Sequence, residues 1–232
     1  MDRTAPTAPS ISVNAGAAWA AATGVTLSVA AQDGPVTGAV AAGLASVQVA
    51  SNAAFTGAST FAMADTVPWT LPAGDGTKTV YARFLDKAGN VSAAASDAIV
   101  LDTTGPTAPS ITLGGNAEAQ GGYTGTPVVT ATLSATDVNE GAGKANLQVR
   151  VANDLAFSGA NWQPYTTSLQ WVLPTGDGTK TVYAQFRDAA GNTSATASNT
   201  IQLLATPPGG GSIVLAGGAA ATSLQTIPAT IS

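Results

Sequence analysis

Acidic side chains are the residues of this chain best suited to chemistry, and they recur in matched pairs. Asp75 and Asp86 return further along the chain as Asp177 and Asp188. Two carboxylates at a fixed spacing can serve as a general acid and a general base. Each of these four, however, lies in a turn rich in Gly or Asn, where Asp accepts hydrogen bonds from its own backbone. We therefore expect them to shape turns rather than to catalyse a reaction.

The composition removes the usual catalytic and metal-binding residues. The 232 residues include no cysteine and no histidine, which excludes disulfides, thiolate zinc sites, cysteine nucleophiles and a histidine base. Only 8 Lys and Arg stand against 13 Asp and Glu, for a net charge of -5. Binding to nucleic acid needs clustered basic residues, so neither nucleic acid nor another polyanion is an expected partner. We predict that the chain is not an enzyme.

Nearly every notable residue has a copy because the chain is a tandem array. The segment from Trp69 to Asn90 returns with few changes from Trp171 to Asn192. The opening segment, Asp2 to Ile11, returns from Asp102 to Ile111. A repeat of about 100 residues is long enough to fold as one compact domain. The residues singled out above therefore belong to a repeated scaffold, not to one asymmetric site.

The repeat divides the chain into three predicted parts. Residues 1–101 and 102–204 are full units, and residues 205–232 are a linker with the first strands of a partial third repeat, or a donor-strand tail. Because the sequence starts at a repeat boundary and stops inside a repeat, we expect it to be a piece of a longer protein. It shows no signal peptide pattern. No apolar run reaches the roughly 20 residues that span a bilayer, so direct membrane insertion is not expected.

Strand patterns with a period of two run through each unit. Apolar residues alternate over Val25–Val29, Ala45–Val49 and Thr79–Phe84, whereas helical periodicity is absent. Short strands separated by Gly, Asn and Asp turns are typical of an antiparallel sandwich. The predicted fold class is therefore all-β, with tandem sandwiches joined end to end.

The same alternation predicts which side chains form the core. Val80, Ala82 and Phe84 share one face of their strand and are expected to point inward. The large aromatic residues that recur in both units are also expected to pack rather than to bind: Phe55, Trp69, Phe157 and Trp171. Lys78 and its copy Lys180 are expected to be solvated charges that discourage unwanted strand pairing at a sheet edge.

One long motif resembles a known repeat type. Both units carry Trp-x-Leu-Pro-x-Gly-Asp-Gly-Thr-Lys-Thr-Val-Tyr-Ala-x-Phe-x-Asp-x-Ala-Gly-Asn-x-Ser, which resembles the immunoglobulin-like, fibronectin type III-like repeats of large bacterial surface proteins of the adhesin type. The resemblance covers nearly both full units. It implies that fold and an extracellular location on a bacterial surface, but it assigns no ligand site. The preceding Asp-x-Thr-x-Pro-Thr-Ala-Pro looks like the joint of such proteins, and its prolines stiffen the connection.

Three aspartates near these joints are the candidates for a metal site. Asp2, Asp102 and Asp137 could supply oxygen ligands to calcium, as happens at the joints of some surface repeats. Calcium takes about six to eight oxygen ligands, and the sequence contains no dense Asp-x-Asp cluster. The prediction is therefore no cofactor, with calcium at these three residues as the alternative.

Three functions remain open at this point. The first is a structural or adhesive stalk, in which the partners of each unit are the neighbouring repeats. The second is a subunit of an extracellular filament, in which the tail adds a strand to the sheet of another copy of the chain. The apolar anchors of that tail would be Ile213, Leu215, Leu224, Ile227 and Ile231. The third is a carbohydrate-binding accessory module of a secreted enzyme. In that module Trp162 and Tyr165, which only the second unit carries, would contact a surface glycan or a protein ligand.

Overall fold

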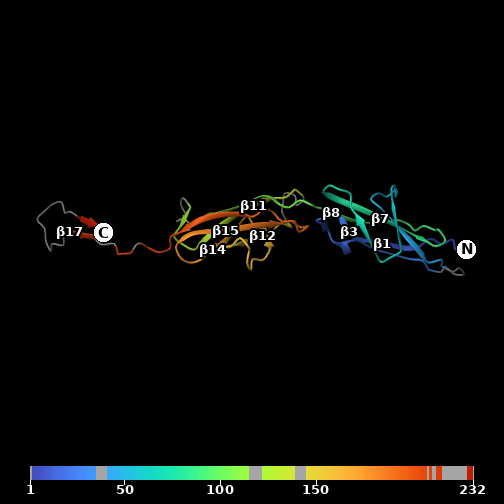
Figure 1. The fold of residues 1–232 in the computed structure, drawn as a ribbon, viewed down its shortest axis with the longest axis horizontal. Helices are drawn as coiled ribbons and strands as arrows, with labels where there is room; N and C mark the ends of the chain where they lie inside the picture. The colour runs from blue at the N-terminus through green and yellow to red at the C-terminus, as the bar shows by residue number, and fades with distance from the viewer. Residues whose placement is uncertain are drawn as a thin grey trace.

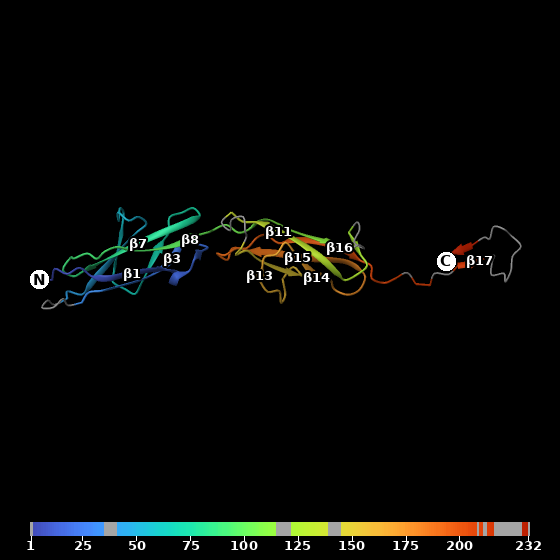
Figure 2. The ribbon, with the colours of Figure 1, turned by 180° about the vertical axis from the view of Figure 1, so that it is seen from behind.

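The computed structural model describes residues 2–34, 41–114, 122–138, 145–207, 209–210, 213–215 and 229–231. Apart from one short 3-10 turn, η1 (Asn14–Gly16), the elements in these ranges are β-strands. Figures 1 and 2 show two β-sandwiches that follow one another along the long axis of the molecule, with β17 beyond the second. The prediction of an all-β fold made of tandem antiparallel sandwiches is confirmed.

The first unit contains eight strands in two sheets. The three-stranded sheet has the order β1 (Thr7–Val13), β3 (Gly24–Gln32), β6 (Thr66–Thr70). The five-stranded sheet has the order β2 (Trp19–Ala20), β8 (Ala95–Leu101), β7 (Gly76–Asp86), β4 (Leu44–Ala50), β5 (Ser59–Ala62). All pairings are antiparallel except that of β2 with β8.

The second unit repeats this arrangement strand by strand. Its three-stranded sheet has the order β14 (Ser168–Val172), β11 (Val128–Thr136), β9 (Thr107–Gly114). Its five-stranded sheet has the order β10 (Tyr123–Thr124), β16 (Ala197–Leu203), β15 (Gly178–Arg187), β12 (Gln148–Ala152), β13 (Gln163–Pro164). Two antiparallel sheets with this division of strands form the immunoglobulin-like sandwich.

The core of each unit lies between its two sheets, as the alternation predicts. Val80, Ala82 and Phe84 on β7 are fully buried, and their copies on β15 are buried to the same extent. Trp69 and Trp171 pack against the two cores from the side. These predictions are confirmed, because a strand with one face toward the core and one toward solvent must follow this pattern.

Phe55 and Phe157 are buried, so the prediction that they pack rather than bind is confirmed. Each lies outside the two core clusters and packs under an arginine, with Arg83 Cζ 4.3 Å from the Phe55 ring centroid.

At Lys78, β7 pairs with β8 alone, because its pairing with β4 begins at Tyr81. At Lys180, β15 likewise pairs with β16 alone, because its pairing with β12 begins at Tyr183. Both lysines therefore lie where their strand is open on one side, and their role against unwanted strand pairing stays a prediction.

The tail contains a short strand pair, β17 (Ile213–Leu215) with β18 (Ala229–Ile231). Ile213 faces Ile231 across this pair, just as Ile111 faces Leu133 between β9 and β11. The tail therefore has the strand register with which each full unit begins. Of the predicted anchors, Leu224 and Ile227 lie outside the described residues, and Ile213, Leu215 and Ile231 are described only as strand backbone.

Candidate functional site

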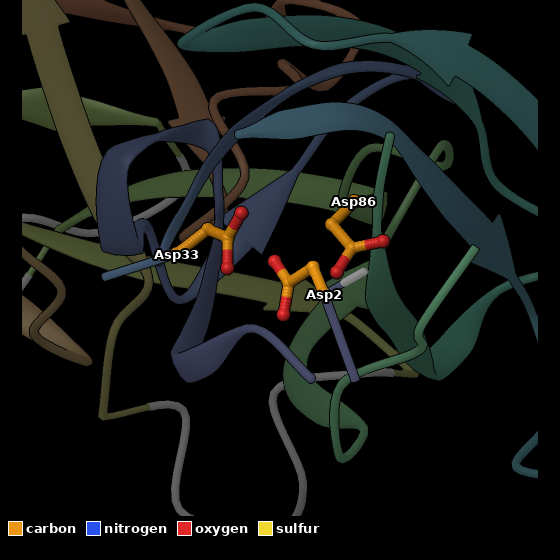
Figure 3. A group of neighbouring side chains, drawn as sticks. All are labelled: Asp2, Asp33 and Asp86. Carbon is orange, nitrogen blue, oxygen red and sulfur yellow. The ribbon is translucent and has the colours of Figure 1, made fainter. Parts of the chain in front are cut away.

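Three aspartates converge at the end of the first unit where the chain starts. Asp2 precedes β1, Asp33 directly follows β3, and Asp86 is the last residue of β7. One carboxylate oxygen from each lies within 4.8 Å of the other two. Figure 3 shows the three side chains side by side, coming from three separate segments of the chain. We call this set the first acidic cluster.

The second acidic cluster consists of Asp102, Asp137 and Asp188. These residues hold the same places in the second unit, and one oxygen from each again lies within 4.8 Å of the others. Asp102 directly follows β8, the last strand of the first unit, and its backbone N–H donates to the carbonyl oxygen of Ala20 at 2.9 Å. Asp137 and Asp188 follow strands of the second unit. This cluster therefore lies in the joint between the two units.

The turn after β7 fixes Asp86 in place. Its Oδ1 accepts hydrogen bonds from the backbone N–H groups of Ala88 and Asn90, both at 2.8 Å, and its Oδ2 accepts one from Asn90 Nδ2 at 2.7 Å. Asp188 is held by Gly191 and Asn192 in the same way. The prediction that these two aspartates shape turns is confirmed.

Each of these turns also fastens the segment that opens its unit. Asn192 Nδ2 donates to the carbonyl oxygen of Asp102 at 2.8 Å, and Asn90 Nδ2 donates to that of Asp2 at 3.4 Å. The turns of the two units have the same geometry, and each places the aspartate of the opening segment beside the aspartate of the turn.

The other pair of aspartates contacts the linkers. Asp75 Oδ1 accepts hydrogen bonds from the backbone N–H of Thr103 at 2.9 Å and from its hydroxyl at 2.8 Å. Asp177 Oδ1 accepts the N–H groups of Ala205 at 2.7 Å and Thr206 at 3.2 Å. The hydrogen bond from the Thr206 side chain lowers the pKa of Asp177 most, and the N–H groups of Ala205 and Thr206 lower it further, against the effect of burial. Both aspartates hold the linker that leaves their unit, a role that the prediction of turn-shaping residues did not include.

In each cluster a buried carboxylate oxygen has no hydrogen-bond donor among the described residues. Asp102 is 0% exposed; its Oδ1 accepts from Thr104, whereas its buried Oδ2 accepts from none of the described residues. Asp33 is similar: its Oδ2 accepts the N–H of Gly43 at 2.6 Å, and its buried Oδ1 has no donor in the described part of the chain. Burying a charged oxygen without a partner is costly, so each cluster provides an oxygen for which a cation would be a suitable partner.

The electrostatics of the two clusters differ. Burial raises the pKa of Asp188, and the neighbouring Asp102 carboxylate raises it further, against the hydrogen bonds from Asn192 and Gly191. Burial also opposes ionisation of Asp86, but the hydrogen bonds from Asn90 and the turn amides outweigh it and lower its pKa. The raised pKa of Asp188 thus has burial as its main cause and repulsion from Asp102 as a smaller one.

Clustered carboxylate oxygens suit a hard cation such as calcium, which takes about six to eight oxygen ligands. Each cluster would supply one oxygen from each of three aspartates. Sequence reasoning had named Asp2, Asp102 and Asp137, but it assigned them to no common geometry. It did not name Asp33, Asp86 and Asp188 as metal ligands. Asp33 and Asp137 directly follow the equivalent strands β3 and β11, which is the signal that could have linked them.

The two aromatic residues proposed as partner contacts do not lie together. Tyr165 packs against the core of the second unit, with its ring 6.0 Å from that of Phe186 and its hydroxyl donating to the carbonyl oxygen of Leu133 at 3.2 Å. Trp162 instead lies against the guanidinium groups of Arg150 and Arg187. The two rings therefore do not form one exposed platform.

Comparison with known proteins gives a likeness of fold. No protein-family profile matches the chain, and no curated protein matches it. The chain is similar to the fibronectin(III)-like modules of Clostridium thermocellum CbhA, with 14% identity, a TM-score of 0.47, and coverage of 84% of this chain and 94% of that one. It is also similar to the D00-D0 domain of Intimin, with 15% identity, a TM-score of 0.33, and coverage of 85% and 100%.

Both units have the immunoglobulin-like, fibronectin type III-like fold that the sequence motif implies, as their strand order shows. A search of the described residues for a helix long and apolar enough to cross a membrane finds none.

Proposed function

We propose that this chain is a non-enzymatic, extracellular spacer of a bacterial surface protein, in which calcium braces the joints between immunoglobulin-like units. One observation carries the proposal. The same three-aspartate cluster recurs at the start of both units, and in the second it includes the residue that directly follows the last strand of the unit before.

Calcium would be held by carboxylates of each cluster, together with water. When bound, it supplies positive charge that offsets three neighbouring carboxylates, and it gives the buried Oδ2 of Asp102 a partner. Asp137 and Asp188 are positioned by β11 and β15, while Asp102 is carried by the linker. A cation shared among them would therefore tie the linker to the second unit.

The linker itself is held from both sides. Asp75 of the first unit accepts hydrogen bonds from Thr103, and Asn192 of the second unit donates to Asp102. Three residues after Thr103, Pro106 is buried and limits the backbone further. A joint fixed at both ends supports an extended arrangement of units, which suits a spacer.

The start of a third unit favours this role over the filament. β17 and β18 pair with each other in the register of β9 and β11, as the first strands of a further repeat would. A strand added to another chain needs no such pairing.

Calorimetric calcium titration and small-angle X-ray scattering test the proposal together. We expect two ions bound per chain, and a longer, more uniform particle in calcium than in a chelator. Changing both Asp102→Asn and Asp137→Asn should leave one ion bound and abolish the response of the shape. Asp154→Asn is the matched control, because Asp154 lies outside both clusters and, among the described residues, its side chain bonds only Ser158 in its own turn. A chain that binds no calcium, or whose shape ignores it, would contradict the proposal.

A further inference from the structure

Two arginines and one tryptophan form a layer on the five-stranded sheet of the second unit. Arg150 lies on β12 and Arg187 ends β15. Their Cζ atoms lie 4.8 Å and 4.6 Å from the ring centroid of Trp162. Arg150 also covers Phe157, at 4.4 Å from its ring centroid. We call Arg150, Trp162 and Arg187 the arginine–tryptophan face.

This face lies on the outer side of the sheet. Arg150 stands between Val149 and Val151, which are buried in the core, and Arg187 follows Phe186, which is also buried. Because successive side chains of a strand point to opposite faces, both arginines point away from the core. Trp162 directly precedes the edge strand β13, and its indole reaches arginines of two neighbouring strands.

The two guanidinium groups are held firmly, but their charge is not neutralised. Gln185 Oε1 accepts from Arg150 Nε at 3.1 Å and from its Nη2 at 2.6 Å. Gln148 Oε1 accepts from the Nε and Nη2 of Arg187. Among the described residues, no carboxylate pairs with either arginine and nothing accepts from their Nη1 atoms. The face therefore offers two fixed positive charges with open donors.

The fold does not require this arrangement. By the repeat, Leu85 and Thr60 of the first unit stand where the second unit has Arg187 and Trp162. The first unit keeps one arginine, Arg83, stacked on Phe55 and bonded to a glutamine. Two of the eight basic residues of the acidic chain are thus gathered on one face of one unit.

We propose that the arginine–tryptophan face binds a glycan that carries acidic, carboxylate-bearing sugars. A guanidinium offers paired N–H donors that match a carboxylate, and an indole provides an apolar surface against which a sugar ring can lie. A short acidic oligosaccharide fits an open sheet face better than a long polyanion does, because the chain as a whole carries a charge of -5. The proposal goes beyond the spacer function and needs no calcium.

Titration with trigalacturonic acid tests the proposal, with its fully methylated ester as the neutral probe. The readout is the NMR shift of the Trp162 indole N–H, followed in a chelator so that calcium plays no part. We expect the acid to shift this signal and the ester to leave it unchanged. Arg187→Leu and Trp162→Thr install the residues of the first unit and should weaken binding by about tenfold or more. Because Trp162→Thr lacks the indole, its binding is followed by a second signal, the Gln185 side-chain amide.

Two further variants keep the outcome decisive. Arg83→Gln removes one positive charge from the first unit and should leave the affinity unchanged. Arg187→Lys keeps the charge of the face but loses the paired donors, so it should bind several-fold more weakly than the natural chain while unfolding at the same temperature. The proposal is overturned if the natural chain fails to bind the acid, if it binds the ester equally well, or if Arg83→Gln weakens binding as much as Arg187→Leu.

Discussion

The two acidic clusters contain the same residue types, yet they constrain different parts of the molecule. All three aspartates of the first cluster belong to one unit, whereas Asp102 of the second cluster directly follows the last strand of the unit before. Asp102 is completely buried, while its counterpart Asp2 is only partly so. The neighbouring unit therefore turns an acidic group on a sandwich end into a buried part of a joint.

A third equivalent position shows how a single residue changes the joint. The backbone N–H of Leu204 donates to Thr124 at 2.9 Å, just as that of Asp102 donates to Ala20. Asp177 also holds the following linker as Asp75 does. The side chain at this place is nevertheless a leucine that is 51% exposed, so it offers no ligand. The backbone of the joint is thus repeated, while its ability to hold a cation depends on one side chain.

The largest effect should come from removing the turn aspartates. Asp188→Ala leaves the part-buried amides of Gly191 and Asn192 without their acceptor and should lower the free energy of unfolding of the second unit by about 2–4 kcal/mol. Asp86→Ala should cost the first unit a similar amount. The two variants should differ in shape: only Asp188→Ala loosens the joint. Urea unfolding together with X-ray scattering measures both properties, and equal changes of shape in the two variants would remove the distinction between the clusters.

A smaller effect should follow from Gly105→Ala. A Cβ atom at Gly105 would lie 2.6 Å from the carbonyl oxygen of Thr193 in the second unit, so the linker must shift. We expect a loss of about 1–3 kcal/mol in unfolding free energy and weaker calcium binding at the second cluster only. Gly114→Ala is the matched control, because no atom lies within 4 Å of its added Cβ. Unchanged calcium binding in Gly105→Ala would show that the close approach does not position Asp102.

Removing the linker contacts should have a still smaller effect. Asp75→Ala deletes the acceptor for Thr103 and should cost about 1 kcal/mol, while widening the range of angles between the two units. Asp177→Ala deletes the equivalent contacts after the second unit and should leave those angles unchanged. Distances between spin labels placed on β7 and β15 would measure the angles. A wider range in Asp177→Ala would mean that these contacts stabilise their own turns instead.

The sequence predicted the sandwiches well because their information is local. Alternation along Thr79–Phe84 identifies the core face, and the motif repeats it in the second unit. The clusters depend on contacts between distant segments, and no spacing along the chain relates Asp33 to Asp86. The prediction of Asp188 as a turn residue is correct, but it did not include the membership of the same carboxylate in the acidic cluster with Asp102. Arg150 and Arg187 likewise meet only through the pairing of β12 with β15.

The smallest expected effect is that of acid. Lowering the pH should change the contributions of Asp86 and Asp188 to folding stability in opposite directions. The pKa of Asp86 is lowered in the folded chain, so the stability it contributes is present above the usual value of 3.8 and is lost as the pH falls below it. The pKa of Asp188 is raised, because burial and Asp102 disfavour its charged form. The folded chain then takes up this proton first, so the contribution of Asp188 becomes more favourable as the pH falls toward 3.8.

Melting temperatures measured in a chelator check this prediction. Between pH 6 and about pH 4, the natural chain should gain stability relative to Asp188→Asn. The stability of the natural chain relative to Asp86→Asn should fall only below that range. If both differences shrink together, the second cluster does not hold its carboxylates in mutual repulsion, and the electrostatic reason for a cation in the joint is lost.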